Sequence, residues 1–270
     1  MDATSQKRYA VVSCHVERPL DDRAWAAFTR LQERRPGGFA VAALMRPPDP
    51  EAGEDEERWL DRAREASARG PLGHHTHWTS PTHARPTGGG DPGALVLREG
   101  MWLRERDLAP TLFCGGGWYT DASVAAACAE LGYVDCTPRA TRPSYLAPEA
   151  PWAQLAAPAR ISVGGASLLA VPTTRTIGDL ARAVWRPSGL SEAVVHVYLH
   201  DTDLLDARRR AALAVGLRAL GRRCRPADLD TVASALAAFA PEVAWADVAR
   251  GGRSPEGAAV ESERARKGPA

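Results

Sequence analysis

The feature that most constrains the fold is a repeated alternation of short apolar runs with amphipathic stretches. Runs suited to strands occupy residues 8–16, 39–45, 71–78, 109–114, 133–137 and 193–199, and patterns suited to helices separate them. Strands that alternate with helices predict a parallel sheet covered by helices. The alternation fits a (β/α) barrel or an open, doubly wound sheet, and both place functional sites in loops at the carboxyl ends of strands.

Capping residues mark the ends of the expected helices. Asp21 or Asp22 begins one helix that ends at residues 36–38 (Pro-Gly-Gly), and Asp121 begins another that ends before Gly132. Further helices are expected at 54–69, 92–108, 177–185, 207–220 and 226–239, with a hairpin at 161–171 that turns at Gly164 and Gly165. We expect a single domain over residues 1–250 and a disordered polar tail over 251–270.

Composition limits the classes of function. The 270 residues carry 34 Lys and Arg against 33 Asp and Glu, which argues against a nucleic-acid binder that acts through bulk charge. No apolar run approaches the roughly 18 residues that cross a bilayer, and the first ten residues lack a signal-peptide core. Five cysteines without a C-x-x-C spacing indicate a reduced protein. We therefore expect a cytoplasmic protein that binds neither nucleic acid nor membrane.

The histidines carry the main chemical signal, because all 7 lie near the ends of three predicted strands. His15 and Glu17 close the first strand; His74, His75, His77 and His83 lie on or after the third; His196 and His200 lie on the last, followed by Asp201 and Asp203. Side chains alternate along a strand, so His15 and Glu17 share one face. His75 and His77 likewise share a face, opposite to His74. Two imidazoles and a carboxylate from another strand suit Zn, Fe, Mn, Co or Ni.

Each of these residues also has a plainer interpretation. A histidine run in a loop is typical of a polar surface, and His196 is expected in the core or behind the site. His83 either stiffens its loop, contacts a substrate or binds the metal. His200 stands where an imidazole acts as a general acid, since its ordinary pKa of about 6.5 lets it hold or lose a proton near neutrality. Asp201 and Asp203 are also expected to cap the following helix.

Gly115, Gly116 and Gly117 follow another predicted strand and precede Trp118 and Tyr119. The segment lacks G-x-G-x-x-G and G-K-[ST], so it gives little support to nucleotide binding. The glycines favour close backbone approach to a ligand, with Trp118 and Tyr119 as an aromatic surface on which a sugar ring stacks. A tight turn with Trp118 in the core is the alternative.

In the order and spacing of these motifs, residues 8–240 resemble the polysaccharide deacetylase family, also known as the NodB homology domain or carbohydrate esterase family 4. The five family motifs correspond to residues 13–17, 73–79, 113–119, Trp185 and 199–201. The chain would be a divergent member. His15 and Val16 stand at the family's base and metal-binding Asp, Thr79 stands at its second metal-binding His, and Cys114 or Gly115 replaces its third-motif Arg.

The resemblance implies a distorted (β/α) barrel of mostly parallel strands that hydrolyses an N-acylated sugar or related carbohydrate amide. It implies a divalent cation, with zinc the first choice, held by His75, His77 and Glu17. His15 or Glu17 would be the base, and His200 would protonate the leaving amine. The residues expected to bind a small-molecule or oligosaccharide substrate are Trp118, Tyr119, His83 and Asp201.

Two other functions stay open at this point. The altered base and orienting arginine favour a catalytically degenerate carbohydrate-binding barrel. The third possibility is a different metal-dependent hydrolase, on a related barrel, that acts on a ureide or a phosphoester.

Overall fold

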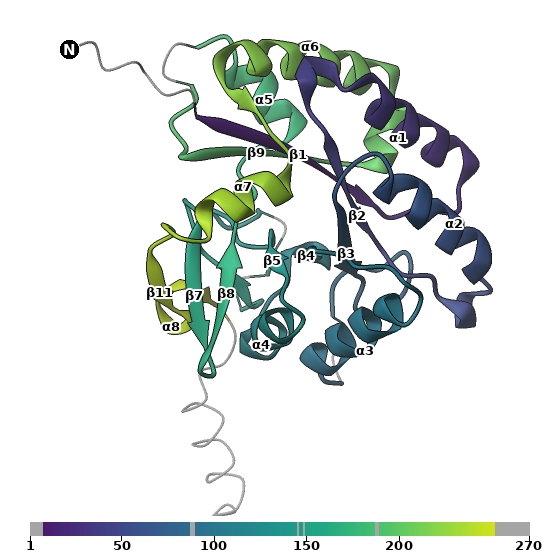
Figure 1. Cartoon of the computed structure of the whole chain (residues 1–270), viewed down its shortest axis with the longest axis vertical. Helices are drawn as coiled ribbons and strands as arrows, with labels where there is room; N and C mark the ends of the chain where they lie inside the picture. The colour runs from purple at the N-terminus through teal and green to yellow at the C-terminus, as the bar shows by residue number, and fades with distance from the viewer. Residues whose placement is uncertain (1–7, 87–89, 145, 148, 187–188, 252–270) are drawn as a thin grey trace, which may run out of the picture.

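The computed structural model describes residues 8–86, 90–144, 146–147, 149–186 and 189–251 (Figure 1). Its centre is a 10-stranded sheet in the order β10-β1-β2-β3-β4-β5-β8-β7-β11, with β9 also paired to β1. The strands are β1 (Tyr9–Val16), β2 (Val41–Met45), β3 (Leu72–Thr76), β4 (Leu112–Gly115), β5 (Val134–Asp135), β7 (Ala159–Val163), β8 (Ala166–Ala170), β9 (Val194–His200), β10 (Arg225–Pro226) and β11 (Glu242–Ala244). Within this sheet only β7 and β8 pair antiparallel in the described ranges.

Helices surround the strands (Figure 1). They are α1 (Asp22–Arg34), α2 (Glu56–Ser67), α3 (Pro92–Arg104), α4 (Ala122–Glu130), α5 (Ile177–Ala183), α6 (Ala207–Arg223), α7 (Leu229–Leu236) and α8 (Trp245–Val248). A separate antiparallel pair joins β6 (Trp152–Ala153) to β12 (Ala249–Arg250). None of the described helices combines the length and the apolar character needed to cross a membrane.

Strand β1 is buried on both faces, and the two faces differ in chemistry. Ala10, Val12, Cys14 and Val16 pack in one apolar cluster with side chains of the surrounding helices, such as Phe28 of α1 and Leu217 of α6. The side chains at the alternate positions of β1 point to the opposite face. Along the strand they change from apolar Val11 to polar Ser13 and His15. The carboxyl end of the strand therefore presents polar groups to the interior of the curved sheet.

The predicted mostly parallel α/β architecture is confirmed, and the predicted strand and helix positions match closely. The hairpin turns where expected, with φ values of 57° and 83° at Gly164 and Gly165, a conformation that favours glycine. The helix expected at 226–239 is instead the short strand β10 followed by α7. Of the tail expected at 251–270, only Gly251 lies within the described residues.

Closure of the sheet into a barrel is not shown. No strand pairing joins β9 or β10 to β11 in the part of the chain that the structure describes. One isolated parallel bridge joins Thr173, in the segment after β8, to Arg139, in the segment after β5. A second joins Arg175, also after β8, to Val197 of β9. The sheet is therefore strongly curved but open.

Candidate metal centre

The carboxyl ends of β1, β3 and β9 bring one carboxylate against three imidazoles. Glu17 directly follows β1, His75 lies in β3 with His77 just after it, and His200 ends β9. The Oε1 atom of Glu17 lies 4.0 Å from His75 Nε2, 3.8 Å from His77 Nε2 and 3.7 Å from His200 Nε2. His74 lies on the other side of β3, where its Nε2 is 2.8 Å from Glu99 Oε2. The predicted alternation of side chains, with His75 and His77 on one face and His74 on the other, is therefore confirmed.

Hydrogen bonds fix which ring nitrogen of each β3 histidine faces Glu17. His75 Nδ1 lies 2.7 Å from the carbonyl oxygen of Cys114, and His77 Nδ1 lies 2.9 Å from that of Pro81. A carbonyl oxygen only accepts, so each Nδ1 carries the proton and donates it. Both Nε2 atoms are buried and have no hydrogen-bond partner among the described residues.

These residues fit a divalent cation. One ligand atom each from Glu17, His75 and His77 lies within 4.8 Å of the others. Bonds of about 2.0–2.2 Å from a cation to nitrogen or oxygen would leave such atoms roughly 3–4 Å apart. A backbone carbonyl behind each histidine is also the usual arrangement that orients a metal-binding imidazole. We refer to Glu17, His75 and His77 as the outer donor set.

The surroundings hold two of these groups in the protonation states that bind cations. Burial raises the pKa of Glu17, but the neighbouring imidazoles of His75, His200 and His77 together lower it to about 2. Burial, assisted by His75, lowers the pKa of His77 to about 3. Near neutral pH the first is an ionised carboxylate and the second a neutral imidazole, which are the ligand forms required for metal binding.

His200 is arranged differently, as a group that keeps its proton. Burial alone would lower its pKa, but the nearby carboxylate of Asp203 and the charges of Glu17 and Asp201 raise the pKa above its ordinary value. Its Nδ1 lies 3.7 Å from Asp203 Oδ2, and the same carboxylate accepts the His200 backbone N–H at 3.0 Å and pairs with Arg209. The sequence predicted Asp203 as a helix cap, and the structure adds that it faces the His200 ring.

His15 lies one layer deeper than Glu17 and is 2% exposed. Its ring centroid is within 4.6–5.5 Å of four other rings, those of His75, His200, Trp118 and Tyr198. Burial, reinforced by the neighbouring histidines, lowers its pKa well below the ordinary value, so the imidazole is neutral. Its Nε2 is a further buried nitrogen without a hydrogen-bond partner in the described ranges.

The aromatic surface expected at Trp118 and Tyr119 is not a pair of exposed rings. Trp118 is 4% exposed and packs against His15, and the Tyr119 hydroxyl donates to Asp121 at 2.6 Å. The glycines before them serve the chain's own turn, because a Cβ at Gly115 would lie 2.2 Å from the carbonyl oxygen of Tyr119. The alternative of a tight turn with Trp118 in the core therefore describes this segment.

Three other positions singled out from the sequence lie away from the imidazoles or serve the scaffold. His83 is exposed in a turn, bridged to Ser80. Asp201 is fully buried, and its carboxylate accepts the backbone N–H of Arg18 at 2.7 Å, which holds the segment that follows Glu17. Trp185, matched to the fourth family motif, is 68% exposed, so it contributes nothing to this site.

The structure adds two residues that sequence reasoning missed. Tyr198 lies in β9 between two of the expected histidines, and its ring contacts those of His15 and His200. Arg139 lies just beyond β5, with its guanidinium carbon 4.5 Å from the Trp118 ring centroid and 5.1 Å from that of Tyr198. The sequence signal that could have identified Arg139 as a candidate is its position just after a predicted strand, where functional residues of such sheets lie.

Open cavities adjoin the site on both sides. One, of about 470 Å³, is lined by Glu17, Arg18 and His77 among others. Another, of about 520 Å³, is lined by Tyr198, His200, Asp203 and the arginines Arg208 and Arg209, among others. Glu17, His77 and His200 therefore border space that a ligand can enter, whereas His75 is buried behind them.

Comparison with known proteins does not assign the chain to a family. No protein-family model matches it, and no curated protein is found to be similar. Among solved structures, it is similar to the 4-α-glucanotransferase from Thermococcus litoralis, with a TM-score of 0.49 and 14% identity over 89% of this chain and 42% of that chain. The chain thus spans less than half the length of that protein, and a likeness of this level says nothing about its own activity.

Proposed function

We propose that this chain is a metal-dependent hydrolase of the polysaccharide deacetylase type, which removes an acyl group from an N-acylated sugar or a related carbohydrate amide. The observation that carries the proposal is the meeting of Glu17 Oε1 with three Nε2 atoms at 3.7–4.0 Å. Two of these nitrogens are buried without a partner among the described residues, which a bound cation would relieve. Under this proposal the curved, open sheet corresponds to the distorted barrel of that family, with the site at the carboxyl ends of the strands.

The protein side chains would divide the chemistry as follows. A divalent cation bound to the outer donor set, with zinc the first choice, would polarise the scissile carbonyl and lower the pKa of the attacking water. His15 is neutral and has a free ring nitrogen, so it is the candidate that takes the proton of that water. His200 holds its proton through Asp203 and would give it to the leaving amine.

The cavities support a substrate that lies across the site. His77 and Glu17 line the first cavity, and His200 lines the second, so a bound chain of sugars would place its scissile bond between cation and acid. The binding-only alternative, which the altered base and orienting arginine favour, expects a sugar to stack on Trp118 and Tyr119, and the burial of Trp118 argues against that surface.

The assay is the release of acetate by the purified full-length chain, loaded with Zn²⁺, from acetamido sugars and their oligosaccharides. Replacing the acid, His200→Ala, is expected to lower kcat by about 10²–10⁴-fold with cation binding retained. The control is His83→Ala, which changes an exposed histidine away from the site. A Zn²⁺-loaded chain that releases no acetate, or that hydrolyses only ureides or aryl phosphates in parallel assays, would contradict the deacetylase proposal.

A further inference from the structure

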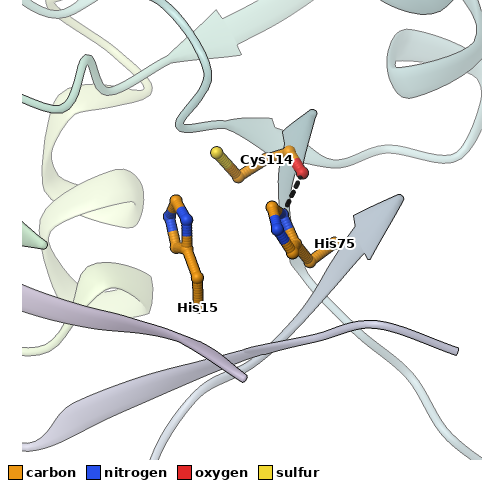
Figure 2. A group of neighbouring side chains, drawn as sticks. All are labelled: His15, His75 and Cys114. Carbon is orange, nitrogen blue, oxygen red and sulfur yellow. Dashed lines mark hydrogen bonds between the residues drawn. The ribbon is translucent and has the colours of Figure 1, made fainter. Parts of the chain in front are cut away.

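A second group of possible cation ligands lies deeper in the molecule, beside His75. One ring nitrogen each of His15 and His75 and the sulfur of Cys114 lie within 4.8 Å of one another. The three side chains come from β1, β3 and β4 and face a common point (Figure 2). All three residues are buried, with exposures of 2%, 1% and 0%. We refer to them as the inner donor set.

Two nitrogens of the inner donor set lack a partner among the described residues. His75 Nδ1 is engaged with the carbonyl oxygen of Cys114, so its Nε2 is the nitrogen that remains available (Figure 2). His15 Nε2 and His75 Nε2 are both buried without a hydrogen-bond partner in the described ranges. The Cys114 thiol makes a long contact, 3.9 Å, with the carbonyl oxygen of Gly115 and also interacts with the Thr137 side chain. Buried polar atoms are normally satisfied, so such a group at one point indicates a ligand that these atoms bind.

We propose that the inner donor set is a second cation position, selective for soft divalent ions such as Cd²⁺. Thiolate favours soft ions, whereas the carboxylate and two imidazoles of the outer donor set suit zinc and harder ions. His75 has one free nitrogen and belongs to both sets. A single ion therefore occupies one position or the other, and the softness of the metal decides which.

Binding at the inner position requires one proton to leave. The S–H bond of Cys114 breaks, a sulfur–metal bond forms, and the proton passes to solvent because both imidazoles are occupied as ligands. Burial, with a contribution from Asp135, raises the pKa of the Cys114 thiol in the free protein, and a coordinated cation reverses this preference. If the proposed function holds, an inner ion also withdraws His15 and His75 from the reaction, so excess soft metal inhibits.

The test is a titration of the metal-free, full-length chain with Cd²⁺, followed by the ultraviolet charge-transfer absorption that a cadmium–thiolate bond produces. The wild-type chain is expected to develop this band up to a single equivalent. Cys114→Ser is expected to lose the band, whereas His77→Ala, which alters only the outer donor set, keeps it. The matched control is Cys128→Ser, which changes a buried thiol of α4 that belongs to neither set.

The outcomes separate this inference from the proposed function. Suppose that the wild-type chain binds Cd²⁺ without the charge-transfer band and that His77→Ala abolishes this binding. That result overturns the inner position and supports the outer one. A chain that binds no divalent ion overturns both. Should Cys114→Ser fail to fold, X-ray absorption of the cadmium-loaded wild type decides: a sulfur atom among the ligands of the metal supports the inner position, and a shell of nitrogen and oxygen alone contradicts it.

Discussion

Burial and near neighbours, rather than residue type, set the charge of the side chains at the candidate site. His77 and His200 both lie close to Glu17, but the His77 side chain is 5% exposed and that of His200 is 34% exposed. Burial dominates at His77 and lowers its pKa to about 3, whereas Asp203 and Glu17 outweigh burial at His200 and raise its pKa. Two identical residue types are thereby prepared for opposite tasks, ligand and acid.

The Asp203–His200 contact gives a prediction that needs neither substrate nor metal. Asp203→Asn removes the carboxylate charge that helps to raise the His200 pKa, while the burial that lowers it remains. The His200 pKa is expected to fall by about one unit or more, which NMR titration of its ring protons in the metal-free chain measures. Asp206→Asn is the control, because Asp206 caps α6 and does not act on His200. An unchanged His200 pKa in Asp203→Asn would refute the assigned role.

Asp135, which lies in β5 beside β4, gives a pH-dependent stability prediction. Its Oδ1 accepts the Thr137 N–H at 2.8 Å, but Oδ2 is buried without a partner in the described ranges, and burial raises its pKa from 3.8 to about 6. Between pH 3.8 and 6 the folded state keeps a proton that the unfolded state has lost, so stability falls as the pH rises through this window.

Asp135→Asn cannot ionise, so it should escape this loss. Relative to wild type, the variant's free energy of unfolding is expected to rise by on the order of 3 kcal/mol between pH 3.5 and pH 7. Urea unfolding of both chains at the two pH values measures the change. A difference between variant and wild type that does not vary with pH would show that Asp135 titrates normally.

At the scale of elements, β3 positions His75, which both donor sets use, and His77, which follows the end of the strand. Gly73 lies in β3 two residues before His75, and its lack of a side chain lets β3 pack closely in the interior. A Cβ there would lie 2.2 Å from Leu44 Cδ2 and 2.9 Å from Leu112 Cβ, both on fully buried side chains. Interiors packed to this density tolerate added atoms poorly.

Gly73→Ala is therefore expected to lower the free energy of unfolding by about 1–3 kcal/mol. Gly178→Ala is the matched control, since its Cβ would meet nothing closer than 3.7 Å, and alanine within α5 should stabilise the helix by about 0.5–1 kcal/mol. Urea unfolding distinguishes the two. Equal effects of both substitutions would mean that the interior beside β3 is not tightly packed.

The sequence predictions that succeed are those about the local geometry of single strands and helices. The two-residue period of a strand is a geometric property, so the sequence alone placed His75 and His77 together and His74 opposite. Similarly, Asp21 and Asp121 were identified as caps, because capping is decided within one turn of the chain. These predictions depend only on local backbone geometry.

Predictions that depend on tertiary contacts were less accurate. The sequence could not show that the carbonyl oxygen of Tyr119 leaves no room for a side chain at Gly115. Nor could it show that the Asp201 carboxylate is buried and accepts the backbone N–H of Arg18. It also gave no reason to place Arg139 beside Trp118, since the two residues come from different strand ends. Which side chains of separate strands meet depends on strand order and twist, which no local pattern encodes.

For the whole molecule, the sheet order explains why distant segments form one site. Strands β1 and β9 are adjacent and parallel with His15 in register with His200, and β2 alone separates β1 from β3. Parallel strands end at the same edge, so Glu17, His77 and His200 must emerge together. The curvature of the sheet then turns their side chains toward each other rather than along a flat edge.

The most direct test of the account is the zinc content of the chain after equilibrium dialysis, compared between wild type, His75→Ala and His83→Ala. His75 contributes to both donor sets, whereas His83 belongs to neither. The account predicts about one tightly held zinc ion in wild type and His83→Ala, and at least a tenfold loss of affinity in His75→Ala. A wild-type chain that binds no zinc, or a His75→Ala chain that binds it as tightly as His83→Ala, would contradict it.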